Sequence, residues 1–339
     1  MYDLIPKDND NREPFKKGGF VVLMVIVVFA LLISAISKMD AINADTKAPK
    51  SASPLSVFHT PREYLAAIHI DGVIETKNQT YDQQWLLDTI SDLAADSYNI
   101  GIFLLINSPG GTVYDSDAVY LALMDYKAQT GRPVYAYMQQ LAASGGYYIA
   151  CAADKIFANR NTLTGSIGVI SGSSIDISQL LEKHGVHYTT ITAGRNKNMG
   201  NINAPLTDEQ RAIMQSLADE CYEQFTQIVA DSRKMDIEAV RSLADGRVYS
   251  AQQALSNGLI DGVARWNEAL DTFDQDINGS TIDYEVVEYE PAIQKKFMDY
   301  LLDAKSLLGG ATAKQDILPK AVQELMPCIS SPAYLYTGN

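Results

Sequence analysis

Apolar residues along most of the chain form short continuous runs that alternate with longer segments of helical spacing. The run IGIFLLI at 100–106 is short and wholly apolar, which is typical of a buried strand in a parallel sheet. The segment 85–95 carries apolar residues at helical spacing instead, which predicts a helix. The same criteria predict strands at 64–70, 134–138, 155–158, 167–171 and 187–192, and helices at 113–127, 145–153, 177–183 and from Thr207 to about Lys234. This alternation favours an α/β fold with a largely parallel sheet.

One segment near the N-terminus departs from this pattern because it is apolar from end to end. Residues 18–37 read GGFVVLMVIVVFALLISAIS and contain no charge, and as a helix they would span roughly 30 Å. A cleaved signal peptide has a shorter apolar core, residues 34–37 make a poor cleavage site, and a buried core helix would carry a polar face. We therefore expect a single transmembrane anchor, preceded by a tail over 1–17 and followed by a linker over 38–61.

The charges that flank the expected anchor bear on its orientation. Lys16 and Lys17 precede it, whereas Lys38, Lys47 and Lys50 follow it, so the positive bias is small. We favour a cytoplasmic N-terminus in the cell (inner) membrane, with the folded domain on the extracytoplasmic side.

The composition of the 339 residues narrows the possible functions. With 47% apolar and 20% charged residues, the chain is unlike an intrinsically disordered protein. Its net charge of −14 argues against a nucleic-acid partner, because polyanions attract basic surfaces. Cys151, Cys221 and Cys328 fit neither a disulfide framework nor a zinc pattern, so we interpret them as buried apolar residues.

Two glycine-containing loops follow predicted strands, where the active sites of parallel sheets gather. The first, NSPGG at 107–111, places Gly110 beside Gly111. Adjacent glycines let main-chain N–H groups face a ligand without obstruction, as an oxyanion hole requires. Taken alone, this segment is more typical of a plain turn.

The second loop, LAASGGYY at 141–148, places Ser144 at the start of a predicted helix. Free N–H groups at a helix start favour a developing negative charge, and Gly145 could supply a second oxyanion donor. The alternative is that Ser144 only caps the helix. The pattern also differs from the nucleophile elbow, because Ala142 replaces its first glycine.

A serine nucleophile needs a base, and the chain offers histidines and lysines. His59 lies in the linker, His69 lies in an apolar strand and is more typical of a satisfied structural histidine, and His184 and His187 flank a turn and are expected at the surface. Lys197 follows a predicted strand, but it could act as a base only if burial lowered its pKa, and its alternative is a solvated loop lysine.

Together these segments resemble the signal peptide peptidase SppA family, which comprises membrane-anchored serine peptidases of the ClpP/crotonase superfamily. The matching stretches are NSPGG at 107–111, AASGGY at 142–147, LTGSIGV at 163–169, GRNK at 194–197 and DGRVYSAQQALSNGLIDG at 245–262. They occur in the family's order between about residues 64 and 265. The resemblance implies repeated β-β-α units, with a peptidase domain over 62–285 and a C-terminal extension over 286–339.

The resemblance also implies roles for particular residues. Ser144 matches the nucleophile, Lys197 its general base, and Ser166 the hydroxyl that orients the lysine. Gly110 or Gly111, together with Gly145, match the oxyanion hole. The ClpP branch has a histidine where this chain has Val169, which favours the Ser/Lys dyad, and no cofactor or metal is needed.

The function that follows is an extracytoplasmic serine endopeptidase that hydrolyses released signal peptides and similar apolar peptides. A half-length member of the family is expected to form a homo-oligomeric ring, with the serine and lysine of one site contributed by neighbouring subunits. The alternatives are a crotonase-like acyl-CoA enzyme, a related membrane protease with one specific protein substrate, and an inactive scaffold. The amphipathic segment 291–308 is expected to pack on a partner or on the domain surface.

Overall fold

The computed structural model describes residues 62–278, 284–291 and 333–335. The expected tail, anchor and linker, and nearly all of the amphipathic segment 291–308, lie outside these ranges and stay predictions. Among the helices within these ranges, none combines the length and the apolar character that a membrane crossing requires.

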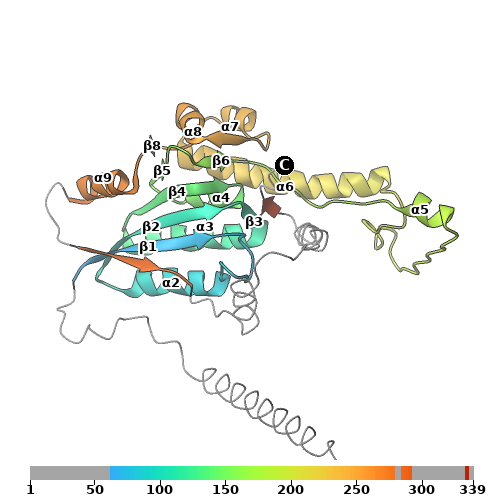
Figure 1. Ribbon diagram of the computed structural model, residues 1–339, viewed down its shortest axis with the longest axis horizontal. Coiled ribbons are helices and arrows are strands. Elements are labelled where there is room, and N and C mark those ends of the chain that lie inside the picture. The colour runs from blue at the N-terminus through green and yellow to red at the C-terminus, as the bar shows by residue number, and fades with distance from the viewer. Residues whose placement is uncertain (1–61, 279–283, 292–332, 336–339) are drawn as a thin grey trace, which may run out of the picture. The chain divides into compact units, whose positions relative to one another are not determined.

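Eight strands form one mostly parallel sheet, which confirms the expected α/β architecture (Figure 1). These strands are β1 (Tyr64–Asp71), β2 (Asn99–Ser108), β4 (Val134–Ala143), β5 (Lys155–Ala158), β6 (Leu163–Gly165), β7 (Val248–Ser250), β8 (Gly262–Val263) and β9 (Glu285–Tyr289). The main path runs β7-β6-β4-β2-β1-β9, and β5 pairs with β4 and β8. The β6–β7 pair is antiparallel, whereas the other pairs are parallel.

Helices cover both faces of this sheet, although not every helix packs on it. The helices are α2 (Gln83–Ala95), α3 (Val113–Thr130), α4 (Gly145–Ala150), α5 (Ser178–Lys183), α6 (Asp208–Arg233), α7 (Ile237–Leu243), α8 (Ala251–Ser256) and α9 (Trp266–Asn278). Ile68 and Ile70 of β1 face a large cluster that includes residues of α2, α3 and α4. Leu65 and Ala67, which point to the opposite face, pack with Ala269 and Phe273 of α9. Burial on both faces explains why the central strands are continuously apolar.

The ends of the helices follow local sequence signals. The Thr112 side chain accepts the Asp115 N–H at the start of α3, and Gly131, with φ of 69°, ends that helix. Thr207 and Gln210 form a reciprocal capping box at the start of α6, so this helix begins where the sequence predicts it.

A long segment after β6 differs from the expected alternation of strands and helices. Residues 167–171 and 187–192 form no strands, and from 168 to 224 no residue is buried. Strands need a paired neighbour, and the edge of β6 beyond β4 is already occupied by β7. We call residues 168–224 the arm; it includes α5 and the first part of α6, which extend away from the sheet in Figure 1.

Two C-terminal segments pair with distant parts of the chain. β9 begins at residue 285, where we expected the peptidase domain to end, and it pairs in parallel with β1 at the edge of the sheet. Further on, β10 (Ala333–Leu335) pairs antiparallel with β3 (Gly110–Thr112). Part of the expected C-terminal extension therefore contributes strands to the folded region.

Candidate active site

Ser144 lies at the turn between β4 and α4 and is only 1% exposed. Its φ of 54° and ψ of −118° fall in a region that residues other than glycine rarely adopt. Its N–H donates to the Gly165 carbonyl oxygen at 2.8 Å, and its side chain makes no capping hydrogen bond. A capping role is therefore not supported. The strained strand–turn–helix geometry is that of a nucleophile elbow, although Ala142 replaces the first glycine.

The structure brings the two glycine loops into contact beside this serine. A Cβ atom on Gly145 would lie 3.1 Å from the Gly111 amide nitrogen and 3.2 Å from Gly110 Cα. A Cβ atom on Gly111 would lie 1.7 Å from the Ile74 carbonyl oxygen, so a side chain at position 111 would displace the loop. Glycine is needed here because the main chains approach so closely.

The three glycines predicted for the oxyanion hole are not equivalent. The Gly110 N–H donates to Ser108 Oγ at 3.0 Å, and that hydroxyl donates in turn to the Gly72 carbonyl at 2.6 Å. The amide of Gly110 is therefore engaged in holding its own loop. Gly111 and Gly145 are the better candidates for oxyanion donors.

Ser166 lies next to Ser144 because their strands are adjacent. Ala143 pairs with Gly165 across β4 and β6, so Ser144 and Ser166 follow directly on two neighbouring parallel strands. Ser166 is 7% exposed and also has a positive φ, of 49°. Its N–H donates to the Arg247 carbonyl at 2.8 Å. Two buried, strained serines therefore lie side by side at the carboxyl ends of the strands.

Lys197 is not brought to this site by the described contacts of its own chain. It is exposed and lies in a turn of the arm, where its N–H donates to the Gly194 carbonyl at 3.1 Å. The neighbouring Arg195 and Asn196 both donate to Glu209, in the first turn of α6. These contacts fix the lysine loop to the outer end of that helix.

The position of α6 shows how far Lys197 is from Ser144. Tyr148, one turn after Ser144, packs on Phe225 with ring centroids 5.0 Å apart, and Gln224 Nε2 donates to its hydroxyl at 2.7 Å. Glu209 lies about four turns before Gln224 in α6, which corresponds to roughly 22 Å along the helix axis. Within one chain, the predicted nucleophile and its predicted base are therefore widely separated.

The other predicted residues have simpler outcomes. His184 and His187 are exposed, as expected. The expectation that His69 is a satisfied structural histidine is wrong, because its Nε2 is buried without a hydrogen-bond partner. Interaction with the Asp71 carboxylate raises the pKa of this imidazole. Cys151 is buried as expected, and Cys221 is half-buried; His59 and Cys328 lie outside the described residues.

One polar residue of the site was not singled out by the sequence. Ser116, in the first turns of α3, is fully buried, and its Oγ has no hydrogen-bond partner. This oxygen lies 2.4 Å from the position that a Cβ on Gly145 would occupy. No motif marks this serine, because its place beside the oxyanion loop depends on how α3 packs against α4.

The mostly parallel sheet, the strained serine and the adjoining glycine loop define a serine protease with a ClpP-like fold. In agreement, the sequence model of Clp protease matches residues 68–183, and that of peptidase family S49 matches residues 126–279.

Three relatives agree with this class. An Enterococcus faecium protein that carries the name signal peptide peptidase SppA is 35% identical over 233 residues, which are 67% of each chain. A Methanocaldococcus jannaschii protein named as a protease is 31% identical and aligns over 81% of this chain and 86% of its own. Protease 4 of Haemophilus influenzae is 29% identical over 71% of this chain and 39% of its own. The chain belongs to peptidase family S49 and is a serine protease, which confirms the resemblance found in the sequence.

Proposed function

We propose that this protein is a membrane-anchored endopeptidase in which Ser144 of one subunit and Lys197 of a neighbouring subunit hydrolyse released signal peptides and similar apolar peptides. The observation that carries the proposal is the strained, buried Ser144 beside Gly111 and Gly145. The chemistry is acyl transfer through a covalent intermediate.

In the first step, neutral Lys197 takes the proton from Ser144 Oγ, and that oxygen attacks the peptide carbonyl carbon. The N–H groups of Gly111 and Gly145 stabilise the oxyanion that forms. The leaving amine takes a proton from the lysine, and water then releases the acyl group by the same steps in reverse roles. Ser166, adjacent to Ser144, is placed to accept a hydrogen bond from the lysine amine and orient it.

The arm supports the sharing of sites between subunits. It presents large apolar side chains to solvent, among them Ile191 at 96%, Ile175 at 64% and Tyr188 at 60% exposed. Large apolar side chains exposed in such numbers are more typical of a subunit interface than of a free surface. A ring in which each arm lies on the next subunit would cover these side chains and carry Lys197 to the neighbour's Ser144.

The pairing of β10 with β3 supports an extended peptide as the substrate. Tyr334 lies opposite Gly111, so a chain segment already binds antiparallel along the oxyanion loop. Peptides bound by strand addition use main-chain hydrogen bonds in the same way. We infer that a substrate pairs with β3 in place of residues 333–335, and that a chain ending at residue 330 hydrolyses peptides several-fold faster than the full chain.

The apolar substrates and the location rest on the expected anchor over 18–37, which would hold the catalytic domain at the extracytoplasmic face where signal peptides are released. The name of the Enterococcus faecium relative agrees with this substrate class. Protease protection in sealed vesicles tests the orientation. In sealed vesicles whose lumen is the extracytoplasmic side, added protease should digest the domain only after the vesicles are opened.

The central experiment measures hydrolysis of a fluorogenic apolar peptide by full-length protein in detergent micelles. Ser144→Ala and Lys197→Ala should each lose activity by a factor on the order of 10³ or more. Lys183→Ala, which removes another lysine of the arm, should keep wild-type activity and serves as the control. Wild-type rates in both dyad variants would refute the assignment.

Co-expression of the two inactive variants tests the shared site directly. If serine and lysine come from different subunits, a random mixture of Ser144→Ala and Lys197→Ala chains regains about a quarter of wild-type activity, since about one site in four receives both groups. If both groups come from the same chain, the mixture stays inactive.

A further inference from the structure

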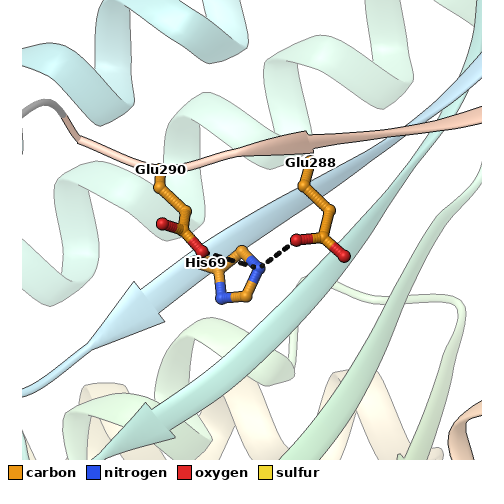
Figure 2. A group of neighbouring side chains, drawn as sticks. All are labelled: His69, Glu288 and Glu290. Atoms are coloured by element: carbon orange, nitrogen blue, oxygen red, sulfur yellow. Dashed lines mark ion pairs between the residues drawn. The ribbon is translucent and has the colours of Figure 1, made fainter.

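The opposite edge of the sheet holds a cluster of ionisable side chains that the peptidase chemistry does not use. His69 lies near the end of β1, and Glu288 and Glu290 extend over it from β9 and the residue that follows (Figure 2). The glutamates are two residues apart on the strand, so their side chains point to the same face. Both carboxylates approach the same imidazole nitrogen, Nε2 of His69, at 3.5 Å.

Hydrogen bonding alone does not account for this arrangement. The Nε2 atom has essentially no solvent exposure and no hydrogen-bond partner, although the side chain as a whole is 14% exposed. Both glutamate oxygens lie at the outer limit of hydrogen-bond distance from Nε2, and neither of them makes a hydrogen bond with it. The two carboxylates also repel each other. A cation bound by all three groups would offset this repulsion and give Nε2 a partner.

The distances from Nε2 to the two carboxylates match those between ligands of one metal ion. A tetrahedral ion with bonds of about 2.0–2.2 Å keeps its ligand atoms about 3.3–3.6 Å apart. The two distances from Nε2 fall in this interval, and one ligand atom from each of the three residues lies within 4.8 Å of the others. We propose that His69, Glu288 and Glu290 bind a divalent transition-metal ion, of which Zn²⁺ is the best match.

The choice of metal follows from the ligand set. Imidazole nitrogen with carboxylate oxygen suits Zn²⁺, whereas Ca²⁺ and Mg²⁺ take oxygen ligands in larger numbers. Asp71 adds a feature that metal-binding histidines usually have, since its Oδ2 lies 3.7 Å from Nδ1, the ring nitrogen opposite the proposed metal. The negative charge of a carboxylate on this side of the ring favours the tautomer that carries its hydrogen on Nδ1, which leaves Nε2 free for the metal.

The metal would fasten β9 to β1 at the edge of the sheet. β9 has only β1 as a neighbour in the sheet path, and the two strands pair over five positions. The chain downstream of Glu290 leads to β10 at the oxyanion loop. The site is therefore a structural clip for the C-terminal part of the chain and does not depend on the proposed peptidase mechanism.

The test uses full-length protein stripped with a chelator and titrated with Zn²⁺ by calorimetry, followed by thermal unfolding. Wild-type protein should bind about one Zn²⁺ per chain, and its Tm should rise by roughly 5 °C at about 100-fold excess over the Kd. His69→Ala and the double variant Glu288→Gln/Glu290→Gln should bind at least tenfold more weakly, with no rise in Tm. Asp71→Asn should weaken binding by about tenfold.

Matched controls separate the site from general charge effects. Glu285→Gln removes an exposed carboxylate from the same strand and should leave binding and the Tm rise unchanged, as should His184→Ala. The glutamates are largely exposed, so their double variant should fold even if His69→Ala does not. The proposal is overturned if wild-type protein binds no Zn²⁺ at 100 µM, or if the double glutamate variant binds it as tightly as wild type.

Discussion

The surroundings of Ser144 and the arm that carries Lys197 differ in almost every physical respect. Ser144 is buried and strained, and Gly165, α4 and the glycine loop hold it in place. The arm has no buried residue over 168–224, and exposed polar contacts to Glu209 hold its lysine loop. Strained backbone persists only where packing over-determines it. Ser144 therefore reaches its buried, strained conformation within one chain, whereas Lys197 is exposed to solvent in its own chain.

The two halves of the proposed dyad are therefore stabilised by different means. The serine half is part of the hydrophobic core and forms when the chain folds. The lysine half gains a buried environment only when another surface covers the arm, because Lys197 is exposed in its own chain. Assembly would then control activity. Variants near Ser144 should change stability and catalysis, whereas variants of exposed apolar residues in the arm should change assembly.

The largest effect is expected at the contact between the two loops of the core region. Gly145→Ala places a Cβ 2.4 Å from Ser116 Oγ and 3.1 Å from the Gly111 nitrogen. The oxyanion donors must move apart, and kcat should fall by roughly 10²–10³-fold, as for the loss of an oxyanion donor. Peptide hydrolysis under saturating substrate measures this fall.

Two further variants identify the cause of that fall. Gly168→Ala meets nothing closer than 3.4 Å and should keep near wild-type activity. Adding Ser116→Ala to Gly145→Ala removes the closest clash but not the contact with Gly111, so the Tm should recover in part while activity stays low. Full recovery of activity in the double variant would show that the Gly111–Gly145 spacing does not matter.

The second prediction compares one isoleucine from each region. Ile149 in α4 is fully buried, so Ile149→Ala should lower the free energy of unfolding by about 2–5 kcal/mol. Ile191 in the arm is 96% exposed, so Ile191→Asp should leave the unfolding of the monomer nearly unchanged. Its expected effect is on assembly, seen as a smaller species in sedimentation. An unchanged oligomer in Ile191→Asp would exclude this part of the arm from the interface.

The same contrast explains what could be predicted from the sequence. The core strands were predicted because burial on both faces produces apolar runs such as 100–106, and the start of α6 because Thr207 is a strong local cap. The strands wrongly expected at 167–171 and 187–192 contain apolar residues, but the described part of the chain offers them no partner strand. An apolar run in an exposed arm and one in a sheet look alike in sequence.

Pairings between distant segments were beyond local pattern. β6 has three residues, and its role in placing Ser166 beside Ser144 comes from its register with β4. The cluster of His69 with Glu288 arises because β9 adds to the edge of β1, more than 200 residues away in sequence. The family resemblance implied a site role for Ser166, which stays a prediction, whereas nothing in the sequence pointed to the cluster at His69.

The third prediction is a smaller effect on catalysis alone. Glu209→Gln removes the charge that binds Arg195 and Asn196, so the Lys197 loop should be held less firmly. We expect kcat to fall by about threefold to tenfold with a Tm within about 1 °C of wild type, because exposed ion pairs contribute little to stability. Asp219→Asn, which alters an exposed contact with Gln215 on the same helix, is the control. Equal losses in both variants would point to α6 in general.

The smallest effect concerns two cysteines, one from each region. Burial raises the pKa of the Cys151 thiol to about 12, so at pH 8 only about one thiol in 10⁴ is ionised and reactive. Cys221, in the arm, is half-buried, and burial also raises its pKa, though it remains more accessible. Iodoacetamide should therefore label Cys221 slowly in the native protein and Cys151 only after unfolding, as followed by peptide mass mapping.

If the arm is covered by a neighbour, protection of Cys221 should increase with protein concentration, while that of Cys151 stays constant. Concentration-independent labelling of Cys221 would place this residue outside any subunit interface.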